Sequence, residues 1–203
     1  ISADALGYPE SYYTPPSEAV EEIQLIRGAA SLQFGPQFGG LINYKLKKGK
    51  ENKKAEILVR HTIGSFGLNN SFLSLSGTIK SWNYFIYGNY KFGNDWRPNS
   101  NFKTTNGYIY LSKKISKKTK ISIEFTKMYY LAQQAGGLTD NLFNSNPDTS
   151  VRSRNWFRVN WNLGSTTLNH KFNSNLRMSS KTFGLIAKRE SLGYLDEINR
   201  IDP

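Results

Sequence analysis

Few residues of this sequence are of the types that carry out catalysis or bind metals. Its 203 residues include two histidines and no cysteine, which excludes disulfides, cysteine-based zinc sites and cysteine nucleophiles. His61 and His170 stand far apart without metal-ligand spacing, and neither belongs to the Ser/His/acid arrangement that a hydrolase needs. The sequence therefore predicts no catalytic residues, no metal site and no cofactor.

Basic side chains are the most abundant charged groups. Lys and Arg number 27 against 15 Asp and Glu, which gives a net charge of +12 and a pI near 9.8. Such a balance can indicate nucleic-acid binding, which needs a continuous basic face with stacking aromatic residues. The lysines instead cluster at predicted turns, in residues 45–50, 53–54, 113–114 and 117–118. We therefore expect them to face water or lipid headgroups, and we expect no nucleic-acid partner.

The elements that must position these residues are strands. Seven segments alternate apolar and polar residues with a period of two, as where Leu73 and Leu75 alternate with Ser74 and Ser76. This period predicts half-buried antiparallel strands. The seven segments are 55–66, 70–80, 82–92, 108–115, 120–129, 154–172 and 176–187. Several are about twice as long as the usual soluble strand of about five or six residues, which favours an outer-membrane barrel over a soluble barrel or sandwich.

The connections between these strands alternate in length. Short ones lie near residues 81, 116–119 and 173–175, and longer ones span 93–104 and 131–153. Short turns at one end and long loops at the other are typical of outer-membrane barrels. Aromatic residues near the strand ends fit interfacial girdles: Phe66, Trp82, Phe92, Tyr129, Tyr130 and Trp156. The sequence contains no apolar run long enough for a transmembrane helix.

Residues 1–48 differ from the rest of the chain. Prolines 15 and 16 predict a short helical turn. Residues 22–26 and 41–46 predict two short strands, residues 29–32 one helical turn, and residues 35–40 a glycine-rich turn.

The stretch 19–43 resembles the end of the plug domain of TonB-dependent outer-membrane receptors. In that family a V-E-x-I-E-x-x-R-G strand leads to a Gly-rich turn, then to G-G-x-I-N and the first barrel strand. The matching residues here are Glu21, Arg27, Gly28, Gly35, Gly39, Gly40 and Asn43, with Gln24 in place of the second Glu. Residues 12–19, the Gly-Pro-Gln-Phe-Gly-Gly turn and residues 133–140 are similar to the ferric-citrate receptor branch.

The resemblance implies an all-β fold: a transmembrane antiparallel β-barrel of about 22 strands. Residues 49–203 would form its first strands, about seven, and residues 1–48 the C-terminal part of an α+β plug domain. Because seven strands cannot close such a barrel, the chain is expected to be a piece of a longer protein. Glycines at the plug turn fit positions where a β-carbon would clash. Arg27 is too polar to lie unpaired in a packed plug, so we expect it to meet a carboxylate, with Glu21 and Glu22 as local options.

The function implied by the resemblance is TonB-dependent uptake of a ferric chelate, ferric citrate in this branch, across the bacterial outer membrane. The partners would be the chelate, membrane lipid and a TonB-type energy-coupling complex that acts through an N-terminal segment. A receptor for haem, another siderophore or a non-iron nutrient, and a structural subunit of an outer-membrane assembly, are the alternatives.

A citrate-like ligand needs cationic or amide donors for its carboxylates. Gln37 is the first candidate, because its turn resembles the plug apex that faces the ligand in that branch. Further candidates lie in the long loops: Arg97, Gln133, Gln134, Arg152 and Arg154. For each arginine, the alternative is an ordinary solvated loop charge or a contact to a headgroup.

Overall fold

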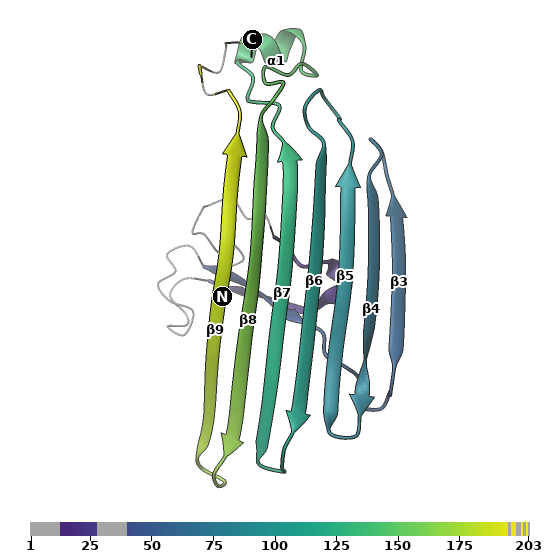
Figure 1. Ribbon diagram of the computed structural model, residues 1–203, viewed down its shortest axis with the longest axis vertical. Coiled ribbons are helices and arrows are strands. Elements are labelled where there is room, and N and C mark those ends of the chain that lie inside the picture. Colours follow the sequence, from purple (N-terminus) through teal and green to yellow (C-terminus); the bar gives the residue numbers. More distant parts are fainter. Residues whose placement is uncertain (1–12, 28–39, 195, 198–199, 201, 203) are drawn as a thin grey trace.

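The computed structural model describes residues 13–27, 40–194, 196, 197, 200 and 202. Within them the chain forms a large sheet of seven strands and a small sheet of two (Figure 1). The large sheet, called the main sheet below, is antiparallel throughout, and each strand pairs with the next along the chain. Its strands are β3 (Glu56–Ile63), β4 (Asn69–Ile79), β5 (Trp82–Gly93), β6 (Phe102–Lys114), β7 (Thr119–Gln133), β8 (Trp156–Lys171) and β9 (Arg177–Leu192). The seven predicted strands are therefore confirmed.

Two strands reach further into the predicted long loops than the sequence pattern indicated. β6 begins at Phe102 rather than at residue 108, and β7 continues to Gln133 rather than ending at residue 129. The early part of β6 carries polar residues, but Thr104 and Asn106 pair with Lys91 and Asn89 of β5. Cross-strand pairing thus extends the strand through a segment that lacks the alternation of apolar and polar residues. Gln133 consequently lies at the end of a strand and not in a loop.

The two faces of the main sheet differ in what they expose. One face, called the open face, presents bare apolar side chains: Ile57, Val59, Leu73, Leu75, Ile86, Ile109, Ile123 and Phe125. Val59 keeps 70% of its surface exposed. The other face, called the covered face, buries hydroxyl and amide side chains, among them Ser74, Ser76, Asn89 and Asn106. It also buries a cluster of aromatic rings: Phe72, Phe85, Tyr87, Tyr108 and Tyr110. A soluble sheet that is packed on one face exposes polar side chains on the other, so the bare aliphatic open face is the unusual feature.

The N-terminal unit lies against the covered face (Figure 1). It consists of residues 13–16, the 3-10 helix η1 (Ser17–Ala19), β1 (Val20–Ile26) and β2 (Leu41–Leu46). The helical turn at the prolines and the two short strands were predicted. Ala19 is fully buried and, with Leu46, packs on a cluster of rings that includes Phe85, Tyr87 and Tyr108. The hydroxyl oxygens of Tyr13 and Tyr87 lie 3.0 Å apart. The division of the chain into residues 1–48 and 49–203 stays a prediction.

The connections of the main sheet alternate in length as expected. The turns after β4, β6 and β8 gather at one end of the sheet, and the longer connections after β5 and β7 gather at the other (Figure 1). The connection after β7 also contains a short helix that the sequence pattern did not predict, α1 (Asp140–Ser145), capped by the Thr139 hydroxyl oxygen. Among the described residues, no helix is long and apolar enough to cross a membrane.

Candidate ligand-binding site

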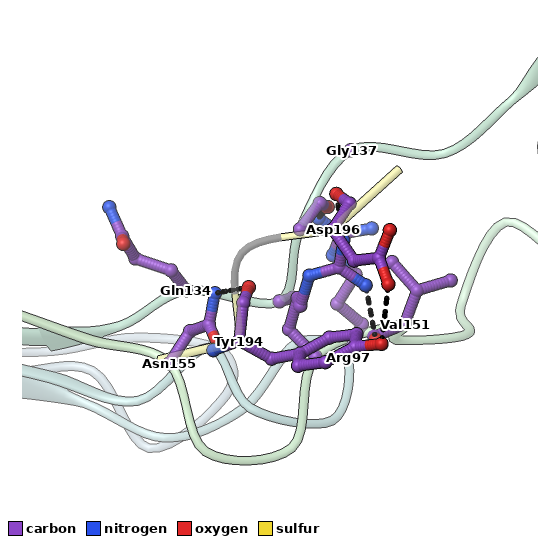
Figure 2. Close-up of a pocket in the computed structure, with 10 residues that line it drawn as sticks. Arg97, Gln134, Gly137, Val151, Asn155, Tyr194 and Asp196 are labelled. Carbon is purple, nitrogen blue, oxygen red and sulfur yellow. Dashed lines mark hydrogen bonds between the residues drawn. The ribbon is translucent and has the colours of Figure 1, made fainter. Parts of the chain in front are cut away.

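A polar cavity of about 550 Å³ opens at the long-loop end of the main sheet. Three chain segments form its walls: the β5–β6 connection, the β7–β8 connection and the segment after β9 (Figure 2). The strand order places them together, because β5, β7 and β9 all run toward this end. The lining residues are Arg97, Gln134, Ala135, Gly136, Gly137, Val151, Arg152, Asn155, Tyr194 and Asp196. Three of the six predicted ligand residues therefore lie at one cavity.

Arg97 connects two of these segments. Its Nη2 donates to the carbonyl of Gly136 at 2.6 Å and its Nη1 to that of Thr149 at 3.4 Å. Its Nε is buried and has no hydrogen-bond partner among the described residues. Gly136 adopts a φ of +79°, and a β-carbon there would lie 2.8 Å from Cγ of Arg152. The glycine thus permits both the left-handed backbone and the close approach of the Arg152 side chain.

Arg152 is buried, with 6% of its surface exposed. Its guanidinium donates to four backbone carbonyls, those of Val151, Asp196, Glu197 and Arg200. A buried cation needs such compensation for lost hydration. Arg152 therefore ties the β7–β8 connection to the segment after β9, and its donors are engaged within the protein.

Tyr194 and Asp196 form the third wall (Figure 2). The Tyr194 hydroxyl donates to Oδ2 of Asp196 at 2.6 Å, which holds the pKa of the carboxyl below its ordinary value, with further help from the backbone N–H of Glu197. The same hydrogen bond raises the pKa of Tyr194. The Arg152 guanidinium carbon lies 5.4 Å from the centre of the Tyr194 ring, as in a cation–π contact. Two guanidinium groups against one carboxylate leave the cavity positive.

The other predicted ligand residues lie around this cavity or outside the described chain. Gln134 lines it, but its side chain is exposed and points away from Arg97 (Figure 2). Gln133 instead accepts hydrogen bonds from the backbone and side chain of Asn101. Arg154 is paired with Asp202 at 2.6 Å. Gln37 lies outside the described residues.

The motif in the N-terminal unit has a clear structural role where it is described. Gln24 accepts from the Asn43 amide at 2.9 Å and donates to Glu22 at 3.0 Å, so the replacement of glutamate keeps a cross-strand link. Gly40 has a φ of +111°, and a β-carbon there would lie 2.6 Å from the carbonyl oxygen of Ile26. Glu21 is exposed. Gly28, Gly35 and Gly39, and the predicted helical turn at residues 29–32, fall outside the described residues.

Arg27 does not behave as expected in the described part of the chain. It is exposed, and none of the ion pairs found between described residues involves it. The carboxylate that links the N-terminal unit to the main sheet is Glu18, which pairs with Arg60 of β3, while Glu22 pairs with Lys45. The exposure of Arg27 removes the desolvation cost on which the expectation was based.

Sequence reasoning missed Asn155, Tyr194 and Asp196. The Asn155 side chain bridges two segments, because its Oδ1 accepts from the backbone N–H of Tyr194 at 2.8 Å. The alternation of strand directions could have found them, since it places the segment after β9 at the same end as the long connections. No group of three or more His, Asp or Glu residues in the described chain could hold a metal ion.

Comparison with known proteins supports the fold and leaves the sequence family open. No protein-family model matches the chain, and no curated protein matches it. Among solved structures, the chain is similar to the ferric citrate transporter FecA in the unliganded form, with a TM-score of 0.74 and 19% sequence identity. The match covers 88% of this chain and 28% of the FecA chain. The main sheet is thus an antiparallel all-β sheet that resembles part of the FecA barrel.

Proposed function

We propose that this chain is part of a TonB-dependent receptor of the bacterial outer membrane that takes up a ferric chelate, with ferric citrate as the preferred ligand. The observation that carries the proposal is that the open face of the main sheet exposes aliphatic side chains although the opposite face is already packed. The open face leaves isoleucine, leucine and valine side chains exposed, while the covered face packs aromatic rings against the N-terminal unit and buries polar side chains beside them. Lipid outside and a plug inside account for both faces at once.

The cavity at the long-loop end supports an anionic ligand. Arg97 and Arg152 outweigh Asp196, and Arg97 retains a donor at Nε without a partner in the described chain. Ferric citrate carries carboxylates that such donors recognise. Because the other guanidinium donors hold loop carbonyls, we expect the ligand to bind with a rearrangement of these loops, of the kind that accompanies binding in many receptors.

Energy coupling is the remaining part of the proposal. A TonB-type complex would act on an N-terminal segment and move the N-terminal unit, which contacts the main sheet through Glu18–Arg60 and Tyr13–Tyr87. No bond of the ligand is made or broken in this process, so the proposal assigns no catalytic residue and no cofactor.

The test uses the full-length gene product and its Gln37→Ala/Arg97→Ala double variant. Loss of two donors should weaken ferric-citrate binding by about tenfold or more, measured by titration calorimetry of the purified protein. Lys117→Ala, at the opposite end of the sheet, is the matched control and should bind like the parent. Equal affinity of the double variant and the parent would refute the site assignment. Normal growth of a deletion strain on ferric citrate as sole iron source would refute the ligand.

A further inference from the structure

The open face of the main sheet changes character toward the long-loop end of β7, β8 and β9. In the middle of the sheet, Leu75, Ile86, Ile109 and Phe125 form one apolar row, because each lies directly opposite the next. Two residues beyond Phe125, the same face carries Lys127. Lys127 lies opposite Asn162 on β8, which shares this face with Asn160 and Arg158. Polar and charged groups thus replace apolar ones on the outward side.

The three cations of this region lie near Asn160. Lys127 donates from Nζ to Oδ1 of Asn160 at 2.6 Å, Lys188 lies directly opposite Asn160 on β9, and Arg158 lies two residues before it. Glu190 joins Arg158 at 2.5 Å and Lys188 at 2.8 Å. We call these five residues the basic patch. Its three positive charges exceed its single negative charge.

The outward charges do not result from a one-residue slip that exchanges the two faces of β7 and β8, as the covered face of the same strand segments shows. There Met128, Val159 and Trp161 are buried in an apolar cluster against Tyr13. The strands therefore keep a packed side, and the basic patch lies on the side that faces outward. Charged side chains beside an apolar surface on the same face need surroundings that are polar at one level and apolar at the next.

The position of the basic patch matches a membrane interface. Tyr90 and Tyr129 lie in the same row of the sheet as Asn160, and aromatic rings of this kind mark headgroup level in membrane barrels. At the other end of β5, Nζ of Lys113 lies 4.9 Å from the centre of the Trp82 ring. Trp82 and Tyr90 are separated by about 27 Å along the strand at 3.4 Å per residue, close to the apolar band of about 25 Å in outer-membrane barrels.

We propose that the basic patch binds the phosphate-bearing headgroup of an anionic lipid in the leaflet on the long-loop side. This inference rests on the proposed function, because it requires the open face to lie in a membrane. Asn160 accepts from Lys127 through its oxygen, so its amide N–H groups remain to donate to a phosphate oxygen beside the Lys127 and Lys188 ammonium groups. Glu190 holds Arg158 in place and repels the phosphate, which confines the headgroup to the Asn160 side.

The test titrates the full-length protein, in detergent, with phosphatidylglycerol and with phosphatidylcholine, and follows bound lipid by native mass spectrometry. The parent should bind the anionic lipid more tightly. The triple variant Lys127→Gln/Arg158→Gln/Lys188→Gln should lose about a hundredfold of that affinity, from about fivefold for each cation near a headgroup. Glu190→Gln should gain about fivefold, a result that misfolding cannot mimic. Lys91→Gln, which removes a lysine from the covered face opposite Thr104, is the control and should change affinity less than about twofold.

The inference would be overturned by undiminished phosphatidylglycerol binding by the triple variant, by an equal loss in Lys91→Gln, or by weaker binding by Glu190→Gln. Capture of an acidic protein by the parent but not by the triple variant, with lipid affinity unchanged, would reassign the patch to a protein partner. A full-length protein that does not enter membranes would refute the proposed function. Entry into membranes without selectivity for the anionic lipid would refute only this inference.

Discussion

Glu18 of the N-terminal unit and Arg60 of β3 form an ion pair in which Oε1 and Nη1 lie 3.1 Å apart. The Glu18 side chain is 7% exposed while that of Arg60 is 56% exposed. This pair, the Tyr13–Tyr87 contact and the packing of Ala19 on the ring cluster connect the N-terminal unit to the main sheet. A ligand-driven or force-driven release of the unit must break them.

The Arg60→Gln variant of the full-length protein should loosen this connection. Because Arg60 is half exposed, the pair contributes only about 0.5 kcal/mol, so the amides of residues 17–26 should exchange about twofold faster with solvent deuterium. Hydrogen-exchange mass spectrometry measures the effect. Arg177→Gln, in β9, removes the same group far from the unit and should leave those amides unchanged; equal acceleration in both variants would contradict the prediction.

The same contact should respond to acid. Burial raises the pKa of Glu18. The hydrogen bonds from its own backbone N–H, from Ser17 and from Arg60 together lower that pKa by more, so that it ends below its ordinary value of 4.5. A lowered pKa means that the carboxylate stabilises the folded state above pH 4.5 and that this contribution disappears as the pH falls through the lower, folded value. Exchange of residues 17–26, corrected for intrinsic rates, should therefore rise only below that range, and Glu18→Gln should abolish the pH response.

Gly77→Ala should destabilise the protein. A β-carbon at Gly77 would lie 2.2 Å from the carbonyl oxygen of Lys54, which also accepts from the Tyr84 hydroxyl at 2.8 Å. Because the obstacle is backbone, we expect a loss of about 1–3 kcal/mol in the free energy of unfolding, measured by urea titration in detergent. Gly88→Ala is the matched control: no heavy atom lies within 4 Å of its added β-carbon, and its cost should stay within about 0.5 kcal/mol.

Arg152→Met should open the loops around the cavity. Methionine fills a similar volume but cannot donate to the four carbonyls that Arg152 holds. These carbonyls can regain water by moving outward, so a local opening costs less than global unfolding. Subtilisin should cleave residues 196–202 about tenfold faster, equivalent to about 1.4 kcal/mol. Arg200→Met removes an exposed guanidinium that pairs only at the surface, so subtilisin should cleave this variant as fast as the parent.

Asp202→Asn should weaken the contact between the segment after β9 and the β7–β8 connection, with a defined pH dependence. The Asp202 carboxylate accepts from Arg154, from the Ser153 hydroxyl and from the Ser153 and Arg154 backbone N–H groups, and Arg154 above all lowers its pKa to about 2. Its contribution is complete above the ordinary pKa of 3.8 and is lost as the pH falls through about 2. Hydrogen exchange of residues 151–154 should thus be protected equally at about pH 7 and about pH 4. The variant should be less protected at both; full protection in the variant would contradict the assignment.

Much of the fold could be predicted from the sequence because strand periodicity is a local property. Alternation in segments such as 70–80 defines two faces without any knowledge of the neighbours. The β6 strand shows the limit of this reasoning: Thr104 and Asn106 belong to a strand only because β5 and β7 pair with them.

The candidate site was less predictable. Charge and amide chemistry pointed to Arg97, Gln134 and Arg152, and the sheet brings all three to one cavity. Their actual bonds could not be foreseen, because the carbonyls of Gly136 and Asp196 that occupy the arginines come from distant connections. For the same reason, the sequence could not reveal that Glu18 contacts the main sheet and that Arg27 has no described carboxylate partner.

The sequence by itself determined that the chain forms long antiparallel strands with short turns at one end, and that its lysines gather at those turns. A period of two, and the spacing of breakers between periods, is enough for both. Only the tertiary structure decided which face is covered. Coverage depends on what lies against the sheet, and here the N-terminal unit packs on the aromatic rings of one face while Ile57, Val59 and Leu73 of the other face stay exposed. That choice of face, and with it the outward position of Lys127, Arg158 and Lys188, arises from long-range contacts that no local pattern encodes.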